Sequence, residues 1–161
     1  MFSKSRIFTI QFLIIALIGC NSNSGPNDSS SDSTYDKQVR LKFDGGLTTI
    51  ISDYKDINYY SSLIRFNIDY YPIVDSVIFS TLMSTEDSTN QCIVDLYNYT
   101  DGVEIANSEI STSSKKSIWV SSGNLLDKLP HKEITLLARV KSENGTSFVI
   151  QSLSYIFIYR H

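Results

Sequence analysis

The chain has 161 residues, a formal net charge of −3 and 12% aromatic residues. It contains no run of lysine and arginine that could follow a phosphate backbone, which argues against nucleic acid as a partner. Two cysteines and two histidines are too few for a zinc site of ordinary ligand spacing, and the sequence predicts neither a metal nor an organic cofactor.

The first segment, residues 1–19, has the order of a secretory signal peptide. Lys4 and Arg6 precede an apolar stretch over residues 7–18, and Gly19 follows it. The stretch is about a dozen residues long, whereas a helix that spans a membrane needs about 20. We therefore predict a cleaved export signal and not a permanent membrane helix.

The residues that end this segment make the prediction more specific. The order Leu17-Ile18-Gly19-Cys20 resembles the lipobox of bacterial lipoproteins. The resemblance implies diacylglycerol on the Cys20 thiol, cleavage before it and acylation of the new amino group, since stable anchoring needs more than one acyl chain. Asn21 is not the aspartate that retains lipoproteins in the inner membrane, so we expect the outer membrane or cell surface. The alternative is an ordinary secreted protein in which Cys20 is incidental.

Residues 21–34 have no aliphatic or aromatic side chain. Such a composition cannot bury enough apolar surface to offset its ordering entropy, so residues 20–34 are predicted to be a lipidated, disordered tether with a reach of roughly 20 Å. The remaining residues, 35–161, have the length of one folded domain.

Apolar and polar residues alternate with a period of two along most of this domain, which predicts β-strands. Residues 39–43 form the first predicted strand, residues 44–46 a turn and residues 47–51 the second strand. The clearest alternation covers residues 64–70 and ends at Pro72, because proline cannot donate to a β-ladder.

The middle of the domain continues this pattern. Residues 77–83 are apolar on both faces and predict a central strand, and residues 92–99 alternate again. Cys92 lies in the second of these strands and is expected to be a buried small hydrophobe. Shorter strands are predicted at residues 103–105 and 117–120, on either side of a serine-rich segment.

One helical segment is predicted, at residues 124–129, with Asn124 as its N-cap and Pro130 as its stop. Asn144-Gly145 then predicts a two-residue type I′ turn and hence a β-hairpin. The strands of that hairpin are residues 134–140 and 148–150, and a last strand follows at residues 155–159.

Eight or nine short strands with almost no helix predict an all-β fold, an antiparallel β-sandwich with a jelly roll as the favoured version. The segments Leu63-Ile64-Arg65-Phe66-Asn67-Ile68, 74–79, 94–98 and 153–159 together resemble the jelly-roll modules called DNRLRE domains and the related carbohydrate-binding modules. The resemblance implies a sugar-binding or cell-surface role and supplies no binding residue. The arginine-rich signature that names the family is absent.

Catalysis has little support in the sequence, and we predict that the chain is not an enzyme. The domain has only His131 and His161 for a serine-histidine relay, one in a loop and one at the chain end. Two carboxylate pairs in polar loops leave calcium binding or hydrolysis open, with solvated surface charge as the ordinary explanation: Asp53 with Asp56, and Glu86 with Asp87.

Aromatic side chains are the better candidates for a site, because an exposed flat ring can stack on the apolar face of a sugar. We select Tyr59, Tyr60 and Trp119, although Trp119 lies between Ile118 and Val120 and the core is its alternative place. The predicted function is a lipid-anchored, non-catalytic binding or adhesion module of the cell envelope, with glycans as the ligand. The alternatives are a structural envelope protein that holds a partner protein by sheet-edge pairing and, third, an accessory domain of a hydrolase or an enzyme.

Overall fold

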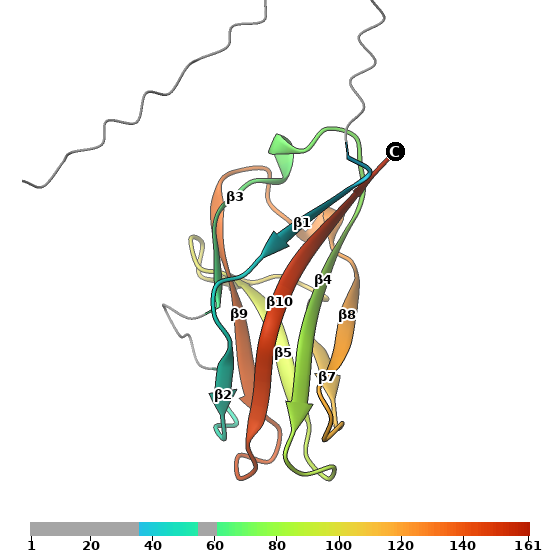
Figure 1. Cartoon of the computed structure of the whole chain (residues 1–161). Coiled ribbons are helices and arrows are strands. Elements are labelled where there is room, and N and C mark those ends of the chain that lie inside the picture. The colour runs from blue at the N-terminus through green and yellow to red at the C-terminus, as the bar shows by residue number, and fades with distance from the viewer. Residues whose placement is uncertain (1–35, 55–60) are drawn as a thin grey trace, which may run out of the picture. The chain divides into compact units, whose positions relative to one another are not determined.

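A computed structural model describes residues 36–54 and 61–161 (Figure 1). All described residues belong to one unit, Thr34–His161. The predicted signal peptide, Cys20 and the predicted tether lie outside the described residues. No helix in the described part of the chain is long and apolar enough to span a membrane.

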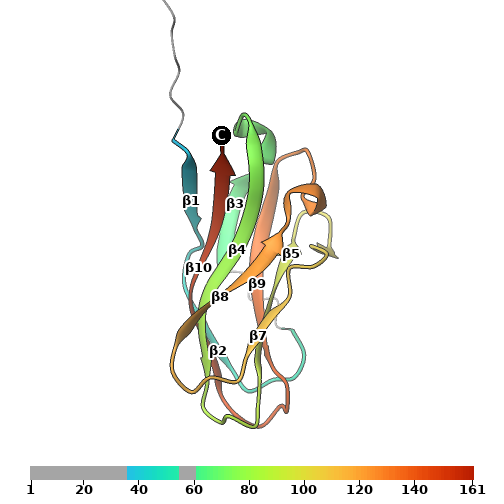
Figure 2. The same cartoon turned by 90° about the vertical axis from the view of Figure 1, so that its right-hand side faces the viewer.

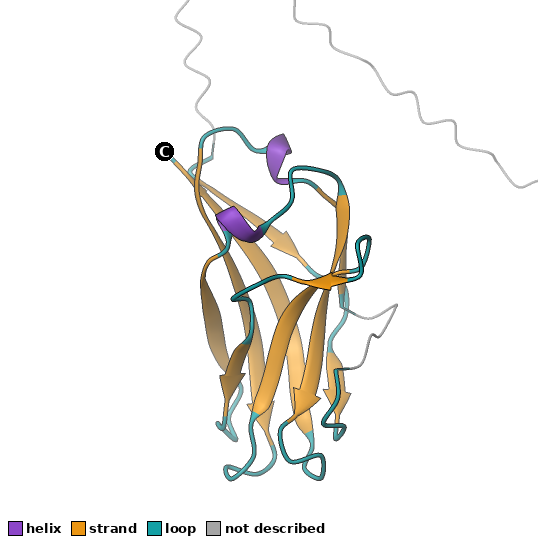
Figure 3. Cartoon of the chain, turned by 180° about the vertical axis from the view of Figure 1, so that it is seen from behind, coloured by secondary structure: helices purple, strands orange, loops and turns teal. Residues whose placement is uncertain are grey.

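The unit Thr34–His161 consists of two antiparallel sheets that pack face to face (Figure 2). Sheet A contains β1 (Gln38–Lys42), β2 (Leu47–Thr49), β10 (Val149–Arg160), β4 (Val74–Thr85) and β8 (Ile118–Asn124). Sheet B contains β3 (Ser62–Phe66), β9 (Ile134–Ser142), β5 (Cys92–Asn98), β6 (Val103–Glu104) and β7 (Ile110–Thr112). The described residues also contain two short 3₁₀ helices, η1 (Ile68–Tyr70) and η2 (Leu126–Lys128) (Figure 3).

The strand order confirms the predicted sandwich and is that of a jelly roll. β1 and β2 both pair with β10, and β6 and β7 both pair with β5, so each couple occupies one strand position. Counted in this way, the positions run 1-8-3-6 in sheet A and 2-7-4-5 in sheet B. This is the order in which two Greek keys interleave.

The core lies between the sheets and contains the inward half of each alternating pattern. β10 supplies Ile156 and Ile158, β4 supplies Phe79, and all three are fully buried. Phe43 packs edge-on against Phe79 with 6.0 Å between ring centroids. Burial of each such side chain contributes about 1.5–3 kcal/mol, so this interior carries a complete core and the unit can be studied by itself. Cys92 is also fully buried, as predicted.

The prediction for residues 64–70 is wrong in detail. β3 ends at Phe66, and residues 68–70 form η1, whose N-cap Asn67 accepts a hydrogen bond from the Asp69 amide at 3.0 Å. A bulge in β3 places Arg65 at a φ of 55° and leaves Ile64 65% exposed. The alternation therefore does not correspond to one buried face.

The predicted hairpin around Asn144-Gly145 is also wrong, because β9 belongs to sheet B and β10 to sheet A. Gly145 has a φ of 69°, but Asn144 lacks the positive φ that a type I′ turn requires. Instead, the Asn144 carboxamide oxygen accepts hydrogen bonds from the amides of Thr146 and Ser147, at 2.9 and 3.0 Å. The segment is a crossover between the sheets. β10 then continues over twelve residues, where two separate strands were predicted.

Three smaller elements also differ from their predictions. β7 lies inside the serine-rich segment, where no strand was predicted. The predicted helix at residues 124–129 is replaced by the end of β8 and the single turn η2. The turn at residues 44–46 does not reverse the chain, since β1 and β2 follow each other along β10. Gly46 permits this close approach, because a Cβ there would lie 2.7 Å from the Ser152 carbonyl oxygen.

Candidate functional site

Trp119 lies on the outer face of sheet A and is 50% exposed, so the core placement considered for it is wrong. Its neighbour in β8, Val120, stands opposite the buried Thr81 of β4 and points inward. Trp119 stands opposite Leu82 and therefore points outward, because successive side chains of a strand alternate between faces.

Three more rings share this outer face, and all come from β10. Ile156 and Ile158 fill the core, so the residues that alternate with them point outward: Tyr155, Phe157 and Tyr159. The ring centroids of Trp119 and Tyr155 are 5.6 Å apart, and those of Tyr155 and Phe157 are 5.8 Å apart. We call these four residues the aromatic face. Figure 1 looks onto the strands that carry it.

Small side chains on β4 allow the rings to meet across it. Trp119 belongs to β8 and Tyr155 to β10, and β4 lies between these two strands. Ser80 of β4 stands opposite Tyr155 and is 4% exposed. Its hydroxyl accepts a hydrogen bond of 2.9 Å from Ser121 Oγ of β8, so no polar group is left unpaired there.

The rings of the aromatic face are partly exposed and do not form one plane. Tyr159 is 38% exposed, and Tyr155 and Phe157 are half-buried. The planes of neighbouring rings are inclined by 42° and 39°. A ligand with an apolar face can therefore stack on one exposed ring and touch the edge of the next.

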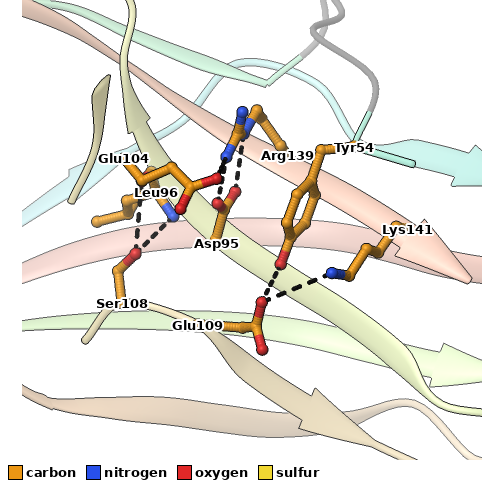
Figure 4. A network of polar contacts seen from close by, with 8 residues as sticks. All are labelled: Tyr54, Asp95, Leu96, Glu104, Ser108, Glu109, Arg139 and Lys141. Carbon is orange, nitrogen blue, oxygen red and sulfur yellow. Dashed lines mark hydrogen bonds and ion pairs between the residues drawn. The ribbon is translucent and has the colours of Figure 1, made fainter. Parts of the chain in front are cut away.

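A second cluster lies on the outer face of sheet B and is built around an ion pair (Figure 4). Arg139 of β9 stands opposite Asp95 of β5 and donates two hydrogen bonds to its carboxylate, at 3.0 and 2.5 Å. Arg139 also donates to Glu104 at 2.8 Å. Its guanidinium lies between the rings of Tyr54 and Tyr97, 4.6 and 4.2 Å from their centroids.

Burial determines the electrostatics of this cluster. Asp95 is 3% exposed, and burial raises the pKa of its carboxyl while Arg139 acts against that rise. The two carboxylates that bind Arg139 hold the pKa of its guanidinium above the ordinary value, although burial itself acts to lower it. Burial also raises the pKa of Tyr54, whose hydroxyl donates a hydrogen bond of 2.5 Å to Glu109. Each charge of the cluster has a partner, so the cluster fastens Tyr54 to β9 and to Glu109.

This cluster was not predicted from the sequence. Asp95 and Arg139 stand at outward positions of alternating strands, where charged residues are common, so neither residue alone was a signal. The register that sets them opposite each other follows only from the sheet.

The other predicted site residues either are exposed or lie outside the described residues. Tyr59, Tyr60 and Asp56 lie outside the described residues. Asp53 and Glu86 are exposed, and Asp87 accepts a hydrogen bond from the Thr89 amide at 2.9 Å that lowers its pKa. Within residues 36–54 and 61–161, no group of three or more histidine, cysteine, aspartate and glutamate side chains could hold a metal ion.

Both histidines are exposed and lie beside a carboxylate. His131 Nδ1 is 2.6 Å from Asp69 Oδ1, which agrees with the predicted loop position, and His161 contacts Asp75. The thiol of Cys92 is enclosed by the core, and burial raises its pKa to about 12. A thiol with that pKa is not a nucleophile at neutral pH.

No model of a known protein family matches the chain, and no curated protein matches it in sequence. The resemblances to lipoprotein signals and to DNRLRE modules therefore stay predictions.

Proposed function

We propose that this chain is a lipid-anchored protein of the bacterial cell envelope whose β-sandwich binds glycans without catalysing a reaction. The aromatic face of sheet A is the proposed binding surface. The observation that carries the proposal is the gathering of four rings on one outward face, with the one tryptophan of the chain half-exposed among them.

Physical chemistry supports a sugar on such a surface. The rings present apolar area to solvent, and covering that area with the C–H groups of a sugar ring releases water. Polar groups beside the rings can bind the sugar hydroxyls, as in most small-ligand sites. The hydroxyls of Ser121 and Tyr159 stand at outward positions there. The cluster on sheet B is the weaker candidate, because its polar groups already bind one another.

The experiment uses the unit Thr34–His161, whose core is complete, on a glycan array. Trp119→Ala is expected to lower binding by about tenfold or more, since a central ring provides much of the contact energy. Tyr99→Ala is the matched control, because Tyr99 is also 50% exposed but lies at the end of sheet B. Equal loss in both variants, or an array without binding, would contradict the proposal.

The proposed anchor has a separate test, because it depends on the predicted lipobox. In cells that express the whole chain, mass spectrometry of the membrane fraction should find the mature protein beginning at Cys20 with acyl groups attached. Cys20→Ala should release it from the membrane. A chain that keeps Met1 and carries no acyl group would refute the anchor and leave the glycan proposal standing.

A further inference from the structure

We propose that the ligand of the aromatic face is an acidic glycan, one that carries carboxylate or sulfate groups. This inference rests on the proposed glycan-binding function and adds the chemical class of the sugar. It follows from the two charges of β1 beside the rings, which are both positive.

Two cations on β1 flank the aromatic face. Arg40 stands opposite Phe157, and Lys42 stands opposite Tyr155. Residues opposite each other in an antiparallel pair point to the same face, so both cations lie beside the rings. Both are exposed, and neither forms an ion pair with a carboxylate of residues 36–54 or 61–161.

Arg40 is already positioned to bind an anion. Its guanidinium carbon lies 5.2 Å from the ring centroid of Tyr155. A guanidinium in such a cation–π contact still presents N–H donors that match the two oxygens of a carboxylate or sulfate group. A sugar that stacks on the neighbouring rings would therefore bring its acidic group within reach of Arg40. Lys42 supplies a second positive charge, which serves an anion of any geometry.

Acidic side chains are missing from the same surface. In the described residues of β1, β4, β8 and β10, the side chains that alternate with the core are cationic, aromatic, aliphatic or neutral polar. Asp75 lies at the bulge where β4 meets the end of β10, and it contacts His161. A bound anion would meet attraction from two cations and no carboxylate beside the rings, which favours acidic over neutral sugars.

The test compares acidic glycans with neutral forms of the same sugars. The unit Thr34–His161 is applied to an array on which each carboxylated or sulfated glycan stands beside its esterified or desulfated counterpart. The strongest acidic glycan is then titrated while the fluorescence of Trp119 is recorded. Because Trp119 is the one tryptophan of the chain, the signal reports the proposed surface itself.

Three single-charge variants complete the experiment. Arg40→Gln and Lys42→Gln are each expected to weaken binding of the acidic glycan by about three- to tenfold and to leave binding of its neutral form unchanged. Lys132→Gln is the matched control, since it removes one exposed positive charge from a residue that pairs with Asp101, away from the rings. In about 1 M salt, where the Debye length is about 3 Å, the preference for the acidic form should largely disappear.

The outcomes separate this inference from the function on which it rests. Equal binding of acidic and neutral forms, lost in Trp119→Ala and kept in Arg40→Gln, would overturn the acidic class and leave the glycan function intact. An array without any binding would remove both. Binding to vesicles of anionic phospholipid but to no acidic glycan would assign the surface to a membrane and overturn the inference.

Discussion

The ion pair between Asp95 and Arg139 allows the sharpest prediction about stability. Replacing Arg139 with methionine keeps an unbranched, flexible side chain of mostly apolar character, but it removes the guanidinium that lies over Tyr54 and Tyr97 and donates both hydrogen bonds to Asp95. Asp95 is then left 3% exposed beside Glu104, without a cation. Removing one partner of a buried pair typically costs about 3–5 kcal/mol, and we expect a loss in this range at pH 7.

This loss should depend on pH in a defined direction. Burial raises the pKa of Asp95 in the folded protein, and Arg139 opposes that rise, so the variant should have a still higher folded-state pKa. A carboxyl with a raised pKa is least costly when it is protonated. The deficit of Arg139→Met should therefore shrink as the pH falls through the folded-state pKa toward the unfolded value of about 4.

Urea unfolding followed by circular dichroism, at pH 7 and at about pH 5, measures both effects. The double variant Asp95→Leu/Arg139→Met should regain most of the lost stability, because an apolar pair no longer buries an unpaired charge. A loss below about 1 kcal/mol in Arg139→Met at pH 7, or a deficit that grows on acidification, would refute this account of the cluster.

Three further predictions concern single positions. Gly46→Ala should lower the free energy of unfolding in urea by about 1–3 kcal/mol, because its Cβ would lie 2.7 Å from the Ser152 carbonyl oxygen. Gly123→Ala is the control, since nothing lies within 4 Å of its Cβ, and it should change stability by less than about 0.5 kcal/mol. Equal losses in the two variants would contradict the close approach at Gly46. Cys92, with a pKa of about 12, should resist iodoacetamide in the folded protein and react in urea; rapid native labelling would show an accessible thiol. Burial raises the pKa of Tyr54, so the folded state keeps a proton that the unfolded state loses, and stability should fall as the pH rises above about 10. Tyr54→Phe should lose less of its stability over that range, and an identical alkaline decline in both proteins would contradict the shift.

Sequence periodicity predicted the strands well because it depends only on which side chains face the core. It failed where the structure of a segment depends on pairing with strands that are distant in the sequence. Asn144-Gly145 has a strong local preference for a hairpin, but the strands on either side pair in different sheets. β7 contains Ile110 as its one apolar residue, which is too weak a signal beside so many serines.

Only part of the candidate site could be predicted from the sequence, because the rest depends on which strands pair. Trp119 lies between two aliphatic residues, so the pattern could not decide whether the ring or its neighbours face inward. The pairing of β8 with β4 decides it. The alternation of Tyr155, Phe157 and Tyr159 with Ile156 and Ile158 was visible, but its meeting with Trp119 required the strand order of sheet A.

Chemical-shift mapping of the isotope-labelled unit Thr34–His161, titrated with an acidic glycan selected from the array, tests the central claim most directly. The indole N–H of Trp119 gives one signal in the spectrum, since the chain has one tryptophan. We expect the largest shifts at this signal and at the amides of β8 and of residues 155–159, with no change at Tyr70 or Tyr99. Shifts confined to sheet B, or spread evenly over the domain, would show that the aromatic face is not the binding surface.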